Sequence, residues 1–170
     1  KEPAGQAHVH DFNQVIGLVG GTPDDPHDLG GEITIWLDGH KEVITRSSLV
    51  FIPAGVVHGP FLVNRVDRPI FFVDVAMTGS RTSTPKPQPA VPVATKRYSI
   101  IDHTKEQFSV AAGTAPKFQR PAHWTVVSNR ILHIEEDMVP GSFYIDFVWI
   151  WSGTGGAPAP EHDHDWPELI

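Results

Sequence analysis

Three histidines and one glutamine are spaced in a way that could build a metal site. His8 and His10 are two residues apart, so on an extended strand their imidazoles share one face, roughly 6–7 Å apart along the backbone. Gln14 lies an even number of residues further on and shares that face if the strand stays regular. His58 follows a Pro-x-Gly turn after an apolar run, where a neighbouring strand would re-enter. Three imidazoles and one amide oxygen that converge are suitable ligands for a divalent transition metal.

The order and spacing of these residues resemble the two signature motifs of the cupin superfamily. The first motif reads His-x-His, three or four residues, Glu, six residues, Gly, and is occupied here by His8, His10, Gln14 and Gly21. The second contains Pro-x-Gly, two residues and His, and is occupied by Pro53, Gly55 and His58. The resemblance implies an all-β fold, a cupin-type jelly-roll β-barrel, in which His8, His10, Gln14 and His58 surround the metal.

The same resemblance implies a metal-dependent enzyme, an oxygenase acting on a small organic molecule. Three His ligands leave coordination positions open for substrate and dioxygen. Iron is the first expectation for the divalent ion, with manganese, nickel and zinc behind it. The alternative is a non-catalytic cupin that binds, senses or stores a small ligand. Gln14, where the family has Glu, keeps this alternative open, because a neutral amide is a weaker ligand than a carboxylate.

The stretch between the motifs reads as strands and turns. Val15–Val19 is apolar and rich in β-branched residues, and Glu32–Leu37 alternates with period two. Asp38-Gly39 predicts a two-residue hairpin turn, after which Lys41–Thr45 returns. The Gly-, Pro- and Asp-rich stretch 20–31 predicts a long loop that helps to define a ligand pocket.

A second, interrupted copy of the first motif closes the sequence. Gly156, His162, His164 and Glu168 match the motif with its glycine and its carboxylate in place. His162 lies 154 residues after His8, and a repeat near the length of a domain indicates tandem similar domains. We therefore expect a second metal site at His162, His164 and Glu168, completed by a histidine from elsewhere.

These patterns divide the chain into three segments. Residues 1–77 are expected to be the later part of one cupin unit, 78–95 a proline-rich linker, and 96–170 the opening part of a second unit. The chain would then be a fragment of a two-unit protein, which accounts for the missing initiator Met and the motif cut at Ile170. Alternatively, residues 96–170 supply the early strands and 8–77 the late ones, which gives a permuted barrel or a swapped homodimer.

Composition limits the partners that we expect. The formal net charge is −7 without a Lys/Arg cluster, which argues against nucleic acid and anionic membrane surfaces as partners. No apolar run approaches the roughly 18 residues of a membrane span. With no cysteine, a thiolate metal site is excluded and any compartment is compatible, so we take the cytoplasm as the default location. The expected partners are a small molecule and a second chain, or the rest of a parent protein.

Overall fold

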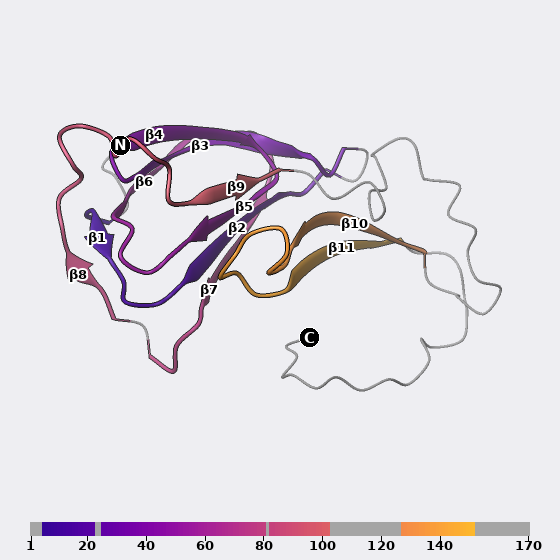
Figure 1. The fold of residues 1–170 in the computed structure, drawn as a ribbon. Coiled ribbons are helices and arrows are strands. Elements are labelled where there is room, and N and C mark those ends of the chain that lie inside the picture. Colours follow the sequence, from indigo (N-terminus) through magenta and orange to yellow (C-terminus); the bar gives the residue numbers. More distant parts are fainter. Residues whose placement is uncertain (1–4, 23–24, 81, 103–126, 152–170) are drawn as a thin grey trace.

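The computed structural model of the chain describes residues 5–22, 25–80, 82–102 and 127–151. Within these residues the protein is all-β, and every pair of hydrogen-bonded strands is antiparallel. Figure 1 shows the strands as two sheets and a separate hairpin. The expected fold class is thus confirmed at the level of an antiparallel all-β protein.

Two sheets form the main body. The larger sheet has the order β4-β3-β6-β1-β8 and consists of β4 (His40–Arg46), β3 (Asp28–Leu37), β6 (His58–Val66), β1 (His8–Val9) and β8 (Thr84–Pro85). The smaller sheet has the order β7-β2-β5-β9 and consists of β7 (Ile70–Ala76), β2 (Gln14–Gly20), β5 (Ser48–Ile52) and β9 (Ser99–Ile101). The remaining pair is the hairpin of β10 (Val127–Ile134) and β11 (Ile145–Trp151).

The turn between β3 and β4 confirms the hairpin that the sequence predicts. Asp38 and Gly39 both have positive φ, 50° and 84°, the combination that a type I′ turn requires. Asp38 is 1% exposed, and its Oδ1 accepts a hydrogen bond of 3.0 Å from the backbone N–H of Val57. The turn therefore also anchors the residue just before His58.

Two apolar clusters lie on opposite faces of the four-stranded sheet. The inner cluster fills the space between the two sheets and contains Ile16, Leu18, Leu29, Ile33, Ile35, Leu37, Ile44, Val50, Ile52, Val56 and Tyr98. The outer cluster joins this sheet to the hairpin and contains Val15, Val19, Leu49, Phe51, Ile131, Leu132, Ile134 and Val139. Figure 1 accordingly shows β10 and β11 on the side of β2 that faces away from β3 and β4.

Burial on both faces explains the continuous apolar sequences of the central strands. All residues of β2 and β5 are buried. Successive side chains of a strand point to opposite faces, so Ile16 and Val50 enter the inner cluster while Val15 and Phe51 enter the outer one. A strand of this kind has no solvent side on which polar residues would alternate.

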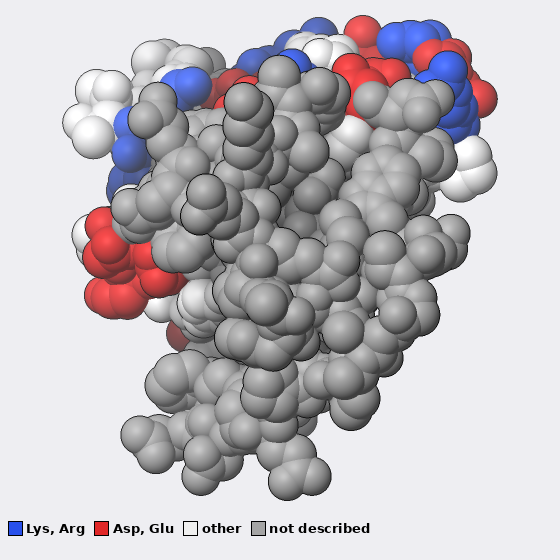
Figure 2. Space-filling model, turned by 90° about the vertical axis from the view of Figure 1, so that its right-hand side faces the viewer, with Lys and Arg blue, Asp and Glu red and all other residues white. Residues whose placement is uncertain are grey.

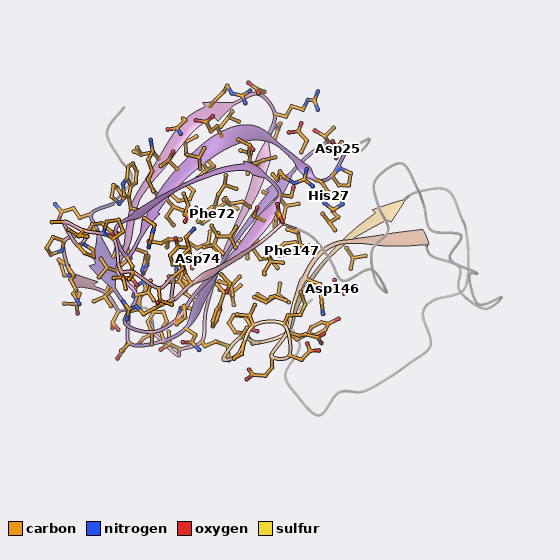
Figure 3. All side chains as sticks on the ribbon, turned by 45° about the horizontal axis from the view of Figure 1, so that its top comes forward. Asp25, His27, Phe72, Asp74, Asp146 and Phe147 are labelled. Carbon is orange, nitrogen blue, oxygen red and sulfur yellow. The ribbon has the colours of Figure 1, made fainter. Side chains whose placement is uncertain are left out.

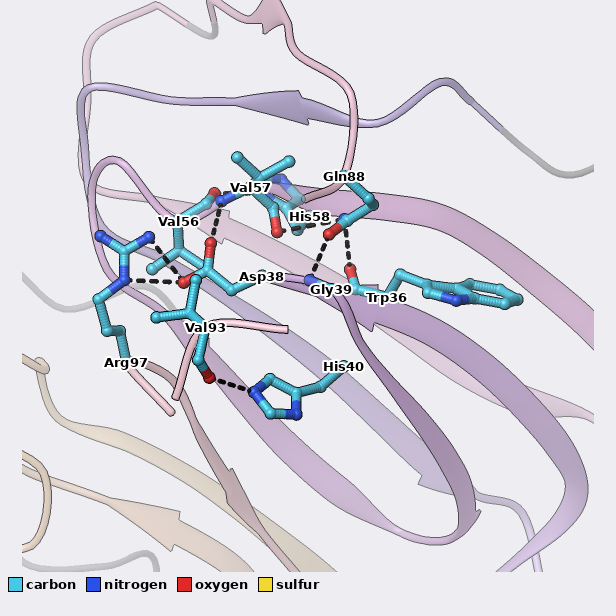
Figure 4. A network of polar contacts seen from close by, with 10 residues as sticks. All are labelled: Trp36, Asp38, Gly39, His40, Val56, Val57, His58, Gln88, Val93 and Arg97. Atoms are coloured by element: carbon cyan, nitrogen blue, oxygen red, sulfur yellow. Dashed lines mark hydrogen bonds and ion pairs between the residues drawn. The ribbon is translucent and has the colours of Figure 1, made fainter. Parts of the chain in front are cut away.

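The proline-rich segment runs along the edge of the larger sheet. It is mostly exposed, and Thr84–Pro85 pair with His8–Val9 as the outermost strand. Further on, Gln88 reaches the β3–β4 turn, where its Oε1 accepts the Gly39 N–H at 2.6 Å (Figure 4). Its Nε2 donates to the carbonyl oxygen of Gly59 at 2.7 Å. The strand after this segment, β9, pairs with β5 of the four-stranded sheet. The division of the chain into two units stays a prediction.

The loop between β2 and β3 does not lie where the sequence predicts. The loop runs from Gly20 at the end of β2 to Asp28, where β3 already begins, so it is shorter than expected. Leu37, at the other end of β3, is the residue that pairs with His58. Ten residues of strand therefore separate the loop from His58, and Figure 3 shows Asp25 and His27 at the far end from β1.

Charged residues are distributed over the surface as pairs of opposite sign. Lys96 Nζ lies 2.6 Å from Glu42 Oε1, and Arg46 Nε lies 3.5 Å from Asp102 Oδ2. Figure 2 shows acidic and basic side chains side by side along the upper rim of one face. In the part of the chain that the structure describes, no helix is long and apolar enough to cross a membrane.

Candidate metal centre

The three histidines of the two motifs meet at one end of the larger sheet. β1 pairs with β6 so that His8 lies directly opposite His58, and His10 follows at the end of β1. The ring centroids of His8 and His58 are 4.3 Å apart, and each of these rings lies 4.9 Å from that of His10. His10 is 5% and His58 3% exposed, and His8 is half-buried. The register of a two-residue strand thus brings together residues that are 50 positions apart.

The geometry leaves room for one ion. Each histidine offers one ring nitrogen within 4.8 Å of the other two. Three such atoms have a common centre no more than about 2.8 Å away, and a metal–imidazole bond needs roughly 2.0–2.1 Å. A shift of less than about 1 Å for each ring would complete the contacts. These three histidines could hold a metal ion.

Backbone carbonyl groups fix the tautomer of all three rings. His8 Nδ1 lies 2.8 Å from the carbonyl oxygen of Gln6, and His58 Nδ1 lies 3.1 Å from that of Val56. His10 Nδ1 bonds the carbonyl oxygen of Thr82 in the same way. A carbonyl oxygen only accepts, so each Nδ1 carries the proton and each neutral ring keeps a lone pair on Nε2. Metal-binding histidines have this arrangement of a ligand nitrogen and an anchored N–H.

The protonation of His58 favours the same role. The pKa of His58 is lowered to about 4, chiefly by burial and with a contribution from the neighbouring His8 and His10, while the Val56 carbonyl and Asp74 oppose the shift. His58 is therefore neutral at pH 7. Neutral imidazole is the form that binds a metal ion.

The turn before His58 is tied to the loop after His10. Gly55 has a φ of 80°, a conformation that glycine adopts without strain, and its N–H donates to the His10 carbonyl oxygen at 2.8 Å. Asn13 Oδ1 accepts the N–H of Ala54 at 2.9 Å. The Phe12 ring stacks on His10 with centroids 4.5 Å apart. These contacts hold the two motifs together around the histidines.

Gln14 reaches the interior by a different route from the one that the sequence predicts. The strand does not stay regular: β1 ends at Val9, the chain turns, and Gln14 opens β2 in the facing sheet. Gln14 is nevertheless 1% exposed. Its Nε2 donates to Asp74 Oδ1 at 2.6 Å, whereas its Oε1 has no hydrogen-bond partner among the described residues. Its role as a ligand stays a prediction.

Asp74 was missed in the sequence. It lies in β7, in register with Ile16 of β2, so its side chain is on the inner face of the four-stranded sheet. Asp74, labelled in Figure 3, is half-buried, and its charge acts on His58. One acidic residue inside the otherwise apolar run Ile70–Ala76 was the available signal.

The other predicted ligands, His162, His164 and Glu168, lie outside the described residues. An open groove of about 520 Å³ borders His10 from outside. It is lined by Val9, His10, Asp11, Ala54, Gly55, Thr82, Ser83 and Thr84. The proline-rich segment thus supplies one wall of the groove beside the histidines.

Comparison with known proteins gives no relative. No family model matches the chain, and neither the curated proteins nor the solved structures contain a match. The functional conclusion therefore depends on the geometry of the site itself.

Proposed function

We propose that this chain is a divalent-metal protein of the cupin type, and that it acts as an oxygenase on a small organic molecule. The observation that carries the proposal is the cluster of His8, His10 and His58, each with Nδ1 bonded to a backbone carbonyl oxygen. Imidazole rings as close together as these place several ring nitrogens within reach of one ion. A divalent cation is the group that three converging imidazoles suit.

Iron is the first choice for the ion in this proposal, with manganese, nickel and zinc behind it. Imidazole nitrogens bind iron, nickel and zinc, and the chain has no cysteine that would favour a thiolate site. Within the described residues, the only cluster of three or more His, Asp or Glu side chains able to hold an ion contains no carboxylate. An ion held by three neutral ligands keeps its full positive charge, so the site favours an anionic or chelating small molecule.

The surrounding residues have simple tasks in such a site. A bound ion would supply Lewis-acid chemistry, and iron would add one-electron chemistry with dioxygen. The Gln6, Val56 and Thr82 carbonyl groups orient the imidazoles, and Phe12 covers one ring face. The groove along His10 offers an approach from solvent.

Gln14 favours a second candidate function, a non-catalytic barrel that binds a small ligand. An amide at the position of a carboxylate ligand weakens metal binding. Dioxygen consumption with candidate substrates separates the two functions, because only the oxygenase consumes it in proportion to substrate.

The test begins with metal content. The full chain, purified without a histidine tag or added metal, is analysed by plasma mass spectrometry together with the variant His58→Ala. We expect iron, manganese, nickel or zinc in the native chain, and about one equivalent less in the variant. A chain that contains no metal and also refuses reconstitution would overturn the proposal.

A further inference from the structure

Gln14 and Asp74 form a polar pair on the inner face of the four-stranded sheet. On the inner face, Asp74 lies beside Ile16, and Gln14 is two residues before Ile16 on the same face of β2. The pair is joined by the 2.6 Å hydrogen bond from Gln14 Nε2 to Asp74 Oδ1. Gln14 is 1% exposed and Asp74 is half-buried, and burying a polar side chain without partners is unfavourable.

The carboxylate decides which way the amide points. An ionised carboxylate only accepts hydrogen bonds, so Asp74 selects the NH₂ end of Gln14 and turns the oxygen away from itself. That oxygen is buried and lacks a hydrogen-bond partner among the described residues. A buried acceptor in this state is completed by a ligand, a water molecule or an ion.

The pair and the histidines share one end of the main body. Gln14 is the first residue of β2 and pairs with Ile52, the last residue of β5, from which the chain turns towards His58. The charge of Asp74 also acts on the His58 ring. The oxygen of Gln14 and the three imidazoles are therefore the polar atoms at the same end of the interior.

We propose that Asp74 is a positioning residue of the metal site: it holds the Gln14 amide with Oε1 turned toward the ion that His8, His10 and His58 would bind. This inference rests on the proposed function. Asp74 does not touch the ion. Its negative charge polarises the Gln14 amide and so makes Oε1 a better ligand. Asp74, on the neighbouring strand β7, thereby supplies the negative charge that a Glu at position 14 would supply. Gln14 and Asp74 together replace one carboxylate ligand.

The experiment titrates the full chain with Co²⁺ and records both affinity and visible spectrum. Binding that persists in His58→Ala is subtracted as the contribution of other sites. In Asp74→Asn the new amide can accept as well as donate, so it no longer fixes the orientation of Gln14. We expect Co²⁺ affinity to fall roughly 10–100-fold, the typical effect of losing an outer partner of a ligand, with a change in the visible bands.

A reversal of the pair gives the sharper result. Gln14→Glu alone places two carboxylates at a separation of 2.6 Å, where they repel, so we expect weak binding. Gln14→Glu combined with Asp74→Asn lets the amide donate to a carboxylate that ligates directly, and affinity should return to at least the native level. A purely structural role for Asp74 would not produce this rescue. Asp67→Asn, an exposed carboxylate at the far end of β6, serves as matched control and should bind normally.

The outcomes separate the two proposals. If the native chain and His58→Ala bind Co²⁺ equally, the metal site itself falls. If His58→Ala loses binding while Asp74→Asn keeps native affinity and spectrum, the metal site stands and the positioning role is overturned. Should Asp74→Asn fail to fold, as judged by circular dichroism without metal, the comparison of Gln14→Glu with the double variant decides. If the double variant does not bind Co²⁺ more tightly than Gln14→Glu, the proposal is overturned.

Discussion

The two faces of the four-stranded sheet bury similar apolar side chains, yet only the inner face carries a pair of hydrogen-bonded polar side chains at its end. The inner face combines the inner apolar cluster with Gln14 and Asp74. The outer face, under the β10–β11 hairpin, contributes only apolar side chains from β2 and β5. The outer face therefore contributes to stability, whereas the inner face gives up some stability for a polar site.

The largest effect is expected from emptying the outer face. Phe51 is 2% exposed and belongs to the outer cluster. Phe51→Ala should lower the free energy of unfolding by about 3–5 kcal/mol, because it removes a buried ring and leaves a cavity. Chemical denaturation at 25 °C measures the loss, and Co²⁺ binding by the folded fraction should stay native.

The matched control is Phe71→Ala. Phe71 lies in β7 on the same outer face of the sheet as Phe51, but it is 61% exposed. It should change stability by less than about 1 kcal/mol. Equal losses in the two variants would contradict the assignment of the outer face to stability.

The second largest effect is expected on metal affinity, at the end of the main body where the three histidines lie. His58→Ala removes a ligand, so Co²⁺ affinity should fall by more than the roughly 100-fold upper range for outer partners. Native protein should gain about 4 kcal/mol of stability when the free ion is about 1,000 times Kd, and the variant should gain far less. Thermal melting with and without Co²⁺ measures both.

His40→Ala is the control histidine, because its ring bonds the Val93 carbonyl oxygen at 2.8 Å and is not part of the cluster. It should keep the metal-dependent gain. If Co²⁺ stabilised His40→Ala and His58→Ala equally, the assignment of metal binding to the inner end would be contradicted.

The sequence allowed much of the core to be predicted, because local patterns determine it. The alternation in Glu32–Leu37 and the Asp38-Gly39 turn predicted the β3–β4 hairpin, and continuous apolar runs predicted β2 and β5. The re-entry expected at His58 marked the start of β6 but not its course to Val66, and β7 was not predicted. Their burial is partial, and the residues on both sides of β6 become exposed toward its end, so no clean period of two is visible.

The site was predictable only where motif spacing carried the information. His8, His10 and His58 meet because β1 and β6 pair, as the two motifs suggested. Gln14 was placed on a regular strand that does not exist. Asp74 depends on the pairing of β2 with β7, which joins residues 60 positions apart. Such long-range pairing leaves no mark in a local pattern.

A smaller effect tests how closely the hairpin covers the outer face. A Cβ added at Gly17 would lie 3.1 Å from Phe147 Cζ and 3.4 Å from Val73 Cβ. Gly17→Ala should therefore lower the free energy of unfolding by about 1–3 kcal/mol through overpacking. Phe147→Leu in the same chain should recover part of that loss, because it shortens the contacting side chain. Additive losses in a double-mutant cycle would show that the hairpin does not pack against Gly17.

The smallest effect is expected at the edge of the larger sheet, where Gln88 fastens the proline-rich segment beside the inner end. Its amide accepts the Gly39 N–H and donates to the carbonyl oxygens of Trp36 and Val57 (Figure 4). It also donates to the carbonyl oxygen of Gly59. Gln88→Ala should lower the free energy of unfolding by about 1–2 kcal/mol. Because Thr82 of the same segment anchors His10, Co²⁺ affinity should also fall, by less than in His58→Ala.

The control is Lys86→Ala, an exposed neighbour of Gln88, which should leave both the free energy of unfolding and the Co²⁺ affinity unchanged. If Gln88→Ala lowers stability but leaves Co²⁺ affinity intact, the segment supports the sheet edge alone, and the inner site depends only on the two motifs and the Gln14–Asp74 pair.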